Sequence, residues 1–196
     1  GIAEGQRLRE PIFEFFLKSD ALHDPLCNDD HIRVLGWATA DEIAQMKAMT
    51  HKVNAVLKPM FAAAGIDLVA TSSFRDFERQ LTIWNRKWRG ERPLHDRAGR
   101  LLDPARLDDA GRVEAILCWS AIPGGSRHHW GTDVDVIDAA AMPPGYQVQL
   151  VPEEYAANGV FARLASWLAE NMGRFGFHRP YATAGCGAGI EPWHLS

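Results

Sequence analysis

The chain has 196 residues, of which 46% are hydrophobic and 23% are charged. This length fits one domain of about 100–200 residues, and the composition lies far from the low hydrophobicity and high charge of disordered chains. The 21 Lys and Arg residues stand against 25 Asp and Glu, which gives a formal net charge of -4. A chain without a basic excess does not attract phosphate backbones, so no nucleic-acid partner is expected.

No apolar run reaches the ~18–20 residues that span a bilayer, because the longest N-terminal candidate, Ile12 to Leu17, contains Glu14. We therefore expect no transmembrane segment. The chain begins with Gly and shows no signal-peptide pattern, so we expect a processed or trimmed form of something longer. Cys27, Cys118 and Cys186 are an odd number without CxxC spacing, which indicates neither a disulfide framework nor a thiolate metal site.

The first predicted element is a helix that starts after Thr39. Thr39 and Glu42 have the spacing of a capping box, and Gly65 is placed to end the helix. Apolar residues recur between them at helical intervals: Ile43, Met46, Met49, Val53, Val56, Leu57 and Met60. Residues 66–70 then predict a short buried strand, which delivers the chain to the polar residues of segment 72–75.

The second half of the chain predicts further short elements. Asp76 is placed to cap a helix that runs to about residue 88, and a shorter helix over 113–119 leads into a Pro-Gly-Gly turn. Residues 132–137 alternate as a strand, and an amphipathic helix follows over 160–172. Because no regular βαβ rhythm or phosphate-binding glycine loop is present, we predict an α+β domain with a small antiparallel sheet.

The densest polar cluster is segment 126–135, which holds two imidazoles and two carboxylates. Imidazole nitrogen and carboxylate oxygen are ordinary zinc ligands, and a catalytic zinc takes three protein ligands and one water. His128 and Asp135 can supply two of these ligands. His194 is the best candidate for the third, because Glu191 lies three residues before it and a carboxylate beside such a site can carry a proton from water to a departing amine.

Several residues near this cluster keep two interpretations. Asp133 shares a strand face with Asp135, so it either orients a ligand histidine or is itself the ligand. Ser126 either bonds the substrate or holds the turn. Arg75 is either a partner for a substrate carboxylate or an ordinary ion-pair residue, and Trp193 either lines the site or packs in the core.

Three motifs in this order resemble a known family, the zinc D-Ala-D-Ala carboxypeptidases and dipeptidases of the VanY-like type, relatives of the hedgehog and lysostaphin-type metallopeptidases. The resemblance covers roughly residues 40–196. Its motifs are Ser72-Ser73-Phe74-Arg75 with Gln80, Ser126-x-His128-x-x-Gly131-x-x-x-Asp135, and Glu191-x-Trp193-His194. We therefore expect a single metallopeptidase domain over 1–196, in which an extension of residues 1–38 packs on a core of residues 39–196.

The resemblance implies a small central antiparallel sheet flanked by helices and a zinc ion held by His128, Asp135 and His194. It implies Glu191 as the catalytic base, and Arg75 facing the carboxylate of the substrate or its developing oxyanion. Ser126, Gln80 and Trp193 are the further substrate-binding residues that we expect. The implied substrate is a peptidoglycan stem peptide that loses its terminal D-Ala, which in turn implies a periplasmic or extracellular location.

This chain departs from the resemblance in two places. Many members have Ala where this chain has Asp133, and the segment between Arg75 and Ser126 is long, so we expect it to build a wall of the substrate site. Three other functions stay open: an L,D-carboxypeptidase, a peptidoglycan endopeptidase, and a zinc-bearing binding module without catalysis. A closed structural site with Asp133 as fourth ligand is a further alternative, and the sequence predicts neither the oligomeric state nor the physiological metal.

Overall fold

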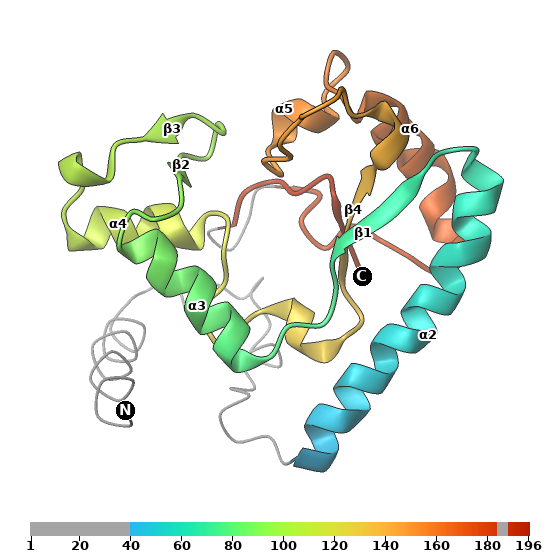
Figure 1. The fold of residues 1–196 in the computed structure, drawn as a ribbon, viewed down its shortest axis with the longest axis horizontal. Helices are drawn as coiled ribbons and strands as arrows, with labels where there is room; N and C mark the ends of the chain where they lie inside the picture. The colour runs from blue at the N-terminus through green and yellow to red at the C-terminus, as the bar shows by residue number, and fades with distance from the viewer. Residues whose placement is uncertain (1–39, 184–187) are drawn as a thin grey trace.

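The computed structural model describes residues 40–183 and 188–196, and it shows a mixed fold with a small antiparallel sheet at its centre (Figure 1). The sheet has the strand order β1-β4-β5, with β1 at Leu68–Ser72, β4 at Val134–Asp138 and β5 at His194–Leu195. This arrangement confirms the predicted fold class. The expected packing of residues 1–38 lies outside the described residues.

Helices and a hairpin surround this sheet. The long helix is α2 at Ala40–Ala64, and a second antiparallel pair joins β2 at Leu94–His95 to β3 at Leu101–Leu102. The other α-helices are α3 at Phe77–Trp88, α4 at Asp109–Leu117, α5 at Pro152–Tyr155 and α6 at Ala162–Asn171. Short 3-10 turns lie at η4 (Pro104–Arg106), η5 (Arg127–Trp130), η6 (Ala139–Ala141) and η7 (Met172–Phe175).

The helix-end signals of the sequence explain where these helices begin and end. Gly65 follows α2 in the left-handed region, at φ +56, where a glycine is favoured. Asp76 caps α3 by accepting a hydrogen bond from the Arg79 amide at 2.8 Å. The helix expected over 113–119 begins earlier, at residue 109, because Asp108 caps it in the same way. Thr39, the expected cap of α2, lies outside the described residues.

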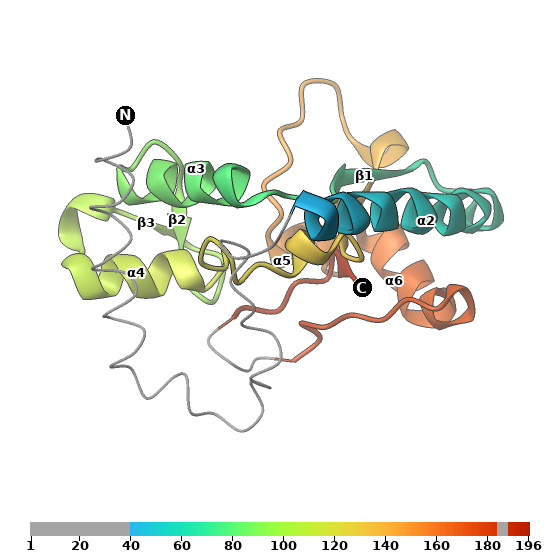
Figure 2. The same ribbon diagram turned by 90° about the horizontal axis from the view of Figure 1, so that it is seen from below.

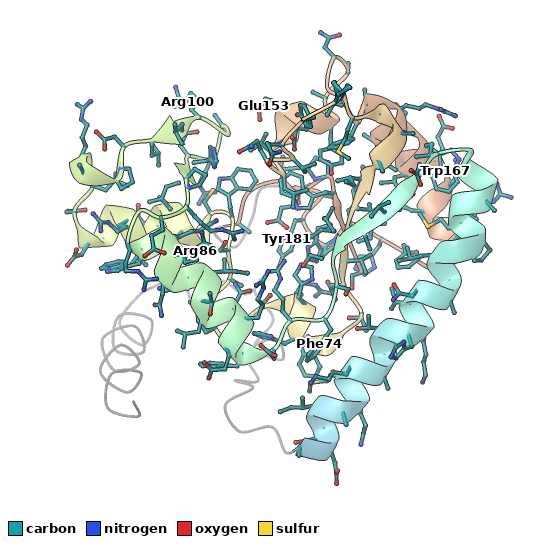
Figure 3. All side chains as sticks on the ribbon, viewed as in Figure 1. Phe74, Arg86, Arg100, Glu153, Trp167 and Tyr181 are labelled. Carbon is teal, nitrogen blue, oxygen red and sulfur yellow. The ribbon has the colours of Figure 1, made fainter. Side chains whose placement is uncertain are left out.

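Two hydrophobic clusters stabilise two groups of elements (Figures 1 and 2). One joins α2 and α6 to the sheet and includes Leu57, Val136 and Leu164, each at most 1% exposed. The other joins α3, α4 and the β2–β3 hairpin through Trp84 and Ile116. In Figure 1 the group of α3, α4 and the hairpin lies on one side of β1 and β4, with α2 and α6 on the other, and the labelled side chain of Tyr181 lies near the middle of the molecule (Figure 3).

The register of the sheet places the sequence motifs side by side. Asp135 in the central strand β4 lies opposite Ser72 of β1, after an irregularity between Ala70 and Ser72. On its other side Asp135 lies opposite His194 of β5. Strand pairing thus joins the three motifs, which are far apart along the chain, at one residue of the central strand.

The close approach of α2 to the turn before β4 gives a stability test. Gly131 has φ +72, and a Cβ there would collide with the carbonyl oxygen of Met46 in α2. Gly145 is the matched control, since it has φ +77 with nothing within 4 Å of the added Cβ. Gly145→Ala should cost the ~1–2 kcal/mol of a left-handed alanine, and Gly131→Ala should cost clearly more because α2 must also move. Denaturant unfolding measures the free energy of unfolding of both variants. Equal losses of that free energy would show that the close approach of α2 to Gly131 does not contribute to stability.

Candidate metal centre

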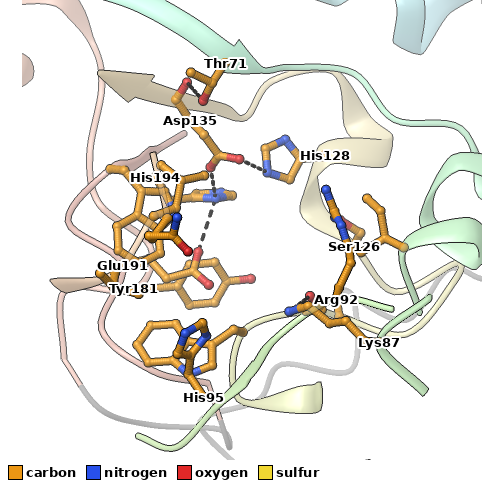
Figure 4. A pocket seen from close by; sticks show the side chains of 18 of the residues that line it. Thr71, Lys87, Arg92, His95, Ser126, His128, Asp135, Tyr181, Glu191 and His194 are labelled. Carbon is orange, nitrogen blue, oxygen red and sulfur yellow. Dashed lines mark hydrogen bonds and ion pairs between the residues drawn. The ribbon is translucent and has the colours of Figure 1, made fainter. Parts of the chain in front are cut away.

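Three buried side chains from three different elements converge on one point (Figure 4). His128 comes from η5, Asp135 from β4 and His194 from β5, and one donor atom from each lies within 4.8 Å of the others. The Asp135 carboxylate lies between the two rings, with Oδ2 3.2 Å from His128 Nε2 and Oδ1 3.1 Å from His194 Nδ1. The structure therefore brings together the three residues that the sequence suggested as ligands.

Hydrogen bonds on the far side of each ring determine which nitrogen faces the cluster. The backbone carbonyl of Ser73 lies 2.9 Å from His128 Nδ1. A carbonyl only accepts, so it holds a proton on Nδ1 and leaves the Nε2 lone pair free. In His194 it is Nε2 that meets a carboxylate, Asp133 Oδ1 at 2.9 Å, which leaves Nδ1 for the cluster. Such outer partners orient ligand histidines in metal sites.

The contacts of Asp133 favour the first of its two interpretations, an orienting carboxylate. It is fully buried and receives hydrogen bonds from Arg127 Nε at 2.7 Å and Thr132 Oγ1 at 2.6 Å. Burial by itself raises the pKa of Asp133, but its bonds with His194 and Thr132 and the charge of Arg127 lower that pKa to about 2. Because Asp133 contacts the opposite nitrogen of His194, it does not join the cluster as a fourth ligand.

The donor set fits a divalent cation. Asp135 Oδ1 is a buried oxygen without a hydrogen-bond partner, which is costly to leave unpaired. Burial raises the pKa of Asp135, yet the neighbouring His128 and His194 rings outweigh burial and hold that pKa well below its usual range. An ionised carboxylate between two free imidazole nitrogens is a set of ligands that zinc accepts.

Glu191 lies next to this cluster. Its Oε2 is 3.4 Å from His194 Nδ1, and its side chain is 13% exposed. Burial raises the pKa of Glu191 to about 7; His194 opposes this rise and Asp135 adds to it. A carboxyl group with a pKa near 7 both accepts and donates protons at neutral pH, which suits general acid–base chemistry.

The guanidinium of Arg75 is held by protein acceptors on both of its edges. Nε and Nη2 donate to Ser72 Oγ at 3.0 and 2.8 Å. Nη2 also donates to Asp135 Oδ2 at 3.2 Å, and Nη1 donates to Gln80 Oε1 at 3.0 Å. The sequence suggested Arg75 as a partner for a substrate carboxylate, but with these contacts the guanidinium is not open to a bidentate bond with one.

Two neighbours position Arg75. Gln80 was expected to bind substrate, but it is fully buried, is not among the residues that line the pocket, and uses both ends of its amide, accepting from Arg75 and donating to the carbonyl of Ala121 at 2.7 Å. His129 Nδ1 lies 2.5 Å from the Arg75 carbonyl, and its Nε2 accepts from the Gly124 amide at 3.1 Å. Both side chains thus fix the segment that carries the guanidinium.

The cluster opens into a pocket of about 440 Å³, within the size range of small-ligand sites. Ser126 and Trp193 line it as expected, and Trp193 also packs on Trp119 with the ring centroids 5.9 Å apart. The segment between residues 83 and 121 supplies much of the wall.

Among the pocket residues that sequence reasoning missed are the titratable side chains of Lys87, Arg92, His95 and Tyr181. None of them lies in a motif, and only the unusual length of segment 76–125 pointed toward the first three. The ring of Tyr181 lies 5.1 Å from that of His194, and burial raises the pKa of its hydroxyl, which therefore stays a proton donor.

The comparisons with known proteins place the fold among peptidases. The structure of VanYB in complex with D-alanine-D-alanine matches with a TM-score of 0.52 and 26% identity, over 74% of this chain and 68% of that chain. The vancomycin resistance D,D-pentapeptidase VanY, a mutant from a VanB-type resistance cassette in complex with Zn(II), matches with a TM-score of 0.51 and 25% identity, over 74% and 69%. The family model of VanY, D-alanyl-D-alanine carboxypeptidase, matches residues 44–196, so the chain belongs to the VanY family. The resemblance stated from the motifs is confirmed.

A second likeness was not predicted. The family model of SAICAR synthetase matches residues 1–72. Phosphoribosylaminoimidazole-succinocarboxamide synthases from Alteromonas mediterranea and Idiomarina loihiensis are 64% and 59% identical to this chain over 69 residues, which are 35% of this chain and 29% of each relative. The chain thus spans less than a third of the length of these curated relatives. Among the described residues, no helix is long and apolar enough to cross a membrane.

Three aspartates near or on β4 give a test of the ligand assignment. Asp135→Asn should lower the affinity for Zn(II) by more than 100-fold, because it removes a ligand charge, whereas Asp133→Asn should lower it by the ~10–100-fold of an outer partner. Asp138→Asn is the control, since Asp138 is also buried but, among the described residues, its side chain caps the Ala140 amide and does not contact the cluster. Competition with a chromogenic chelator measures all three. A larger loss in Asp133→Asn than in Asp135→Asn would reverse the two roles.

Proposed function

We propose that this protein is a zinc-dependent peptidase that hydrolyses peptidoglycan stem peptides, as a D,D-carboxypeptidase that releases terminal D-Ala. The observation that carries the proposal is the Glu191 carboxyl group beside the His128–Asp135–His194 cluster, inside a pocket that suits the end of a peptide. Membership of the VanY family supports the substrate class. The D-alanine-D-alanine and Zn(II) in the names of the two structural neighbours support the ligand and the metal.

The ligands and Glu191 divide the chemistry between them. His128, Asp135 and His194 would hold the ion, which when bound supplies Lewis acidity and lowers the pKa of water. Glu191 accepts a proton from the attacking water as the new carbon–oxygen bond forms. It then gives that proton to the departing amine nitrogen as the peptide bond breaks, so Glu191 ends the cycle in its starting state.

Other pocket residues bind and orient the substrate in this proposal. Arg75 is fixed by Ser72 and Gln80, and it brings a positive charge to the site where negative charge develops on the carbonyl oxygen. The Ser126 hydroxyl lines the pocket and does not cap η5, the turn that follows it, so it is available to the substrate. Trp193 supplies an apolar wall.

The alternatives differ in what they require of the site. A binding module without catalysis has no need of a buried carboxyl group poised to exchange protons, which is what Glu191 provides. An L,D-carboxypeptidase or an endopeptidase would use the same cluster with a different substrate in the pocket. Because the proposed substrate is the cell wall, the proposed location is periplasmic or extracellular.

Replacing the proposed proton carrier tests the mechanism. Glu191→Gln keeps the shape of the side chain and should leave zinc binding intact, because Glu191 is not one of the three ligands. Turnover should fall by the ~10²–10⁴-fold of a lost general base. Glu170→Gln, on the exposed side of α6, is the control and should change neither property. Retained turnover in Glu191→Gln would remove Glu191 from this role.

Product analysis by mass spectrometry tests the substrate. The zinc-loaded protein is incubated with a stem pentapeptide, a tetrapeptide and a crosslinked dimer. We expect loss of one D-Ala from the pentapeptide, and we expect a chelator to abolish it. Cleavage of the tetrapeptide or the dimer alone would replace the D,D-carboxypeptidase with the corresponding alternative, and no cleavage of any substrate would contradict the proposal.

A further inference from the structure

The pocket has an acidic side and a basic side. Glu191 and the Asp135 carboxylate lie on one side, and Lys87 and Arg92 lie across the pocket from Glu191 in the close-up (Figure 4). Lys87 is held in place from α3, where its Nζ donates to Ser120 Oγ at 2.8 Å. The two cations belong to the long segment between Arg75 and Ser126, and not to any of the motifs that identify the family.

Lys87 differs from the two arginines on the acidic side of the pocket, Arg75 and Arg127, in what its charge contacts. Arg75 already contacts Asp135, and Arg127 contacts Asp133. In the described part of the chain, no carboxylate forms an ion pair with the ammonium group of Lys87, whose hydrogen-bond partner is the neutral hydroxyl of Ser120. An ammonium group has three donors, so Lys87 keeps donors for a ligand.

The electrostatics of Lys87 agree with a charge that lacks a counter-ion. Burial and, after it, the charge of Arg92 lower the pKa of Lys87 to about 8, and the charge of Glu191 opposes this only in part. An anion that enters the pocket would stabilise the charged form of Lys87 and gain a charge-assisted hydrogen bond. The exposed guanidinium of Arg92 also lines the pocket and adds positive potential.

We infer that Lys87 recognises the terminal carboxylate of the peptide substrate, with the Ser126 hydroxyl as a second donor. This inference rests on the proposed function and names the group that selects a free chain end. It also assigns a different task to Arg75, because both edges of that guanidinium are bonded to Ser72, Gln80 and Asp135. Arg75 stabilises the negative charge that develops on the reacting carbonyl oxygen, whereas Lys87 binds the terminal carboxylate.

The test compares one peptide that ends in D-Ala-D-Ala as the free acid with the same peptide as the C-terminal amide. A charged hydrogen bond predicts that the unmodified protein prefers the acid in kcat/KM by about 10- to 100-fold. Lys87→Met should bring this ratio close to one. Arg86→Met is the control: it removes a cation from the same helix, labelled in Figure 3, but Arg86 does not line the pocket and faces Glu91.

A binding measurement separates this inference from the proposed function. Zinc-loaded Glu191→Gln protein, with and without Lys87→Met, is titrated with the acid and with the amide in a calorimeter. Selective binding of the acid that disappears in the double variant supports the role of Lys87 even if the unmodified protein cleaves neither peptide. An unchanged acid-to-amide ratio in Lys87→Met, equal losses for both peptides, or no binding of the acid would overturn it.

Discussion

The site depends on the position of Asp135 in the central strand. Strand β4 pairs with β1 on one side and with β5 on the other, and Asp135 lies opposite both Ser72 and His194. One carboxylate therefore meets Arg75, His128 and His194 at once. Because β5 has only two residues, further contacts support it: the side-chain bond between Asp133 and His194, and a backbone bond from the Val136 amide to the Trp193 carbonyl at 3.0 Å. The ligand cluster and the last strand stabilise each other.

The pocket is built from two structural groups with separate hydrophobic clusters. The sheet and the elements that extend it supply the His–Asp–His cluster, Glu191 and Trp193. The group of α3, α4 and the β2–β3 hairpin, which has its own core around Trp84, supplies Lys87, Arg92 and His95. In the proposed function the acid–base chemistry belongs to the first group, and the cations Lys87 and Arg92 belong to the second, while Ser126 and Trp193 of the first group also contact the substrate. Under that proposal, changes in the second group would alter which peptide end is accepted without moving His128, Asp135 or His194.

Helix α2 lies where two family likenesses overlap, since the SAICAR synthetase match ends at residue 72 and the VanY match begins at residue 44. In this structure the helix belongs to the peptidase core, because Leu57 and Met60 are buried in the main cluster. Its backbone also approaches Gly131 so closely that no Cβ fits there. A helix needs only an apolar face of the right spacing to pack against such a core. A segment whose sequence resembles SAICAR synthetase can therefore pack against the sheet of this fold.

Local patterns in the sequence predicted much of this protein. Caps and apolar spacing predicted α2, α3 and β4, and the residue types of two motifs predicted a His–Asp–His cluster with Glu191 beside His194, because these signals act over a few residues. The motif already favoured Asp135 over Asp133, but only the tertiary structure shows what Asp133 contacts, since its partner His194 is 61 residues away along the chain. It also decided that Gln80 is buried behind Arg75 and that Lys87 faces the pocket. Spacing could not decide these points, because they depend on which side chains from distant segments compete for the same hydrogen bonds.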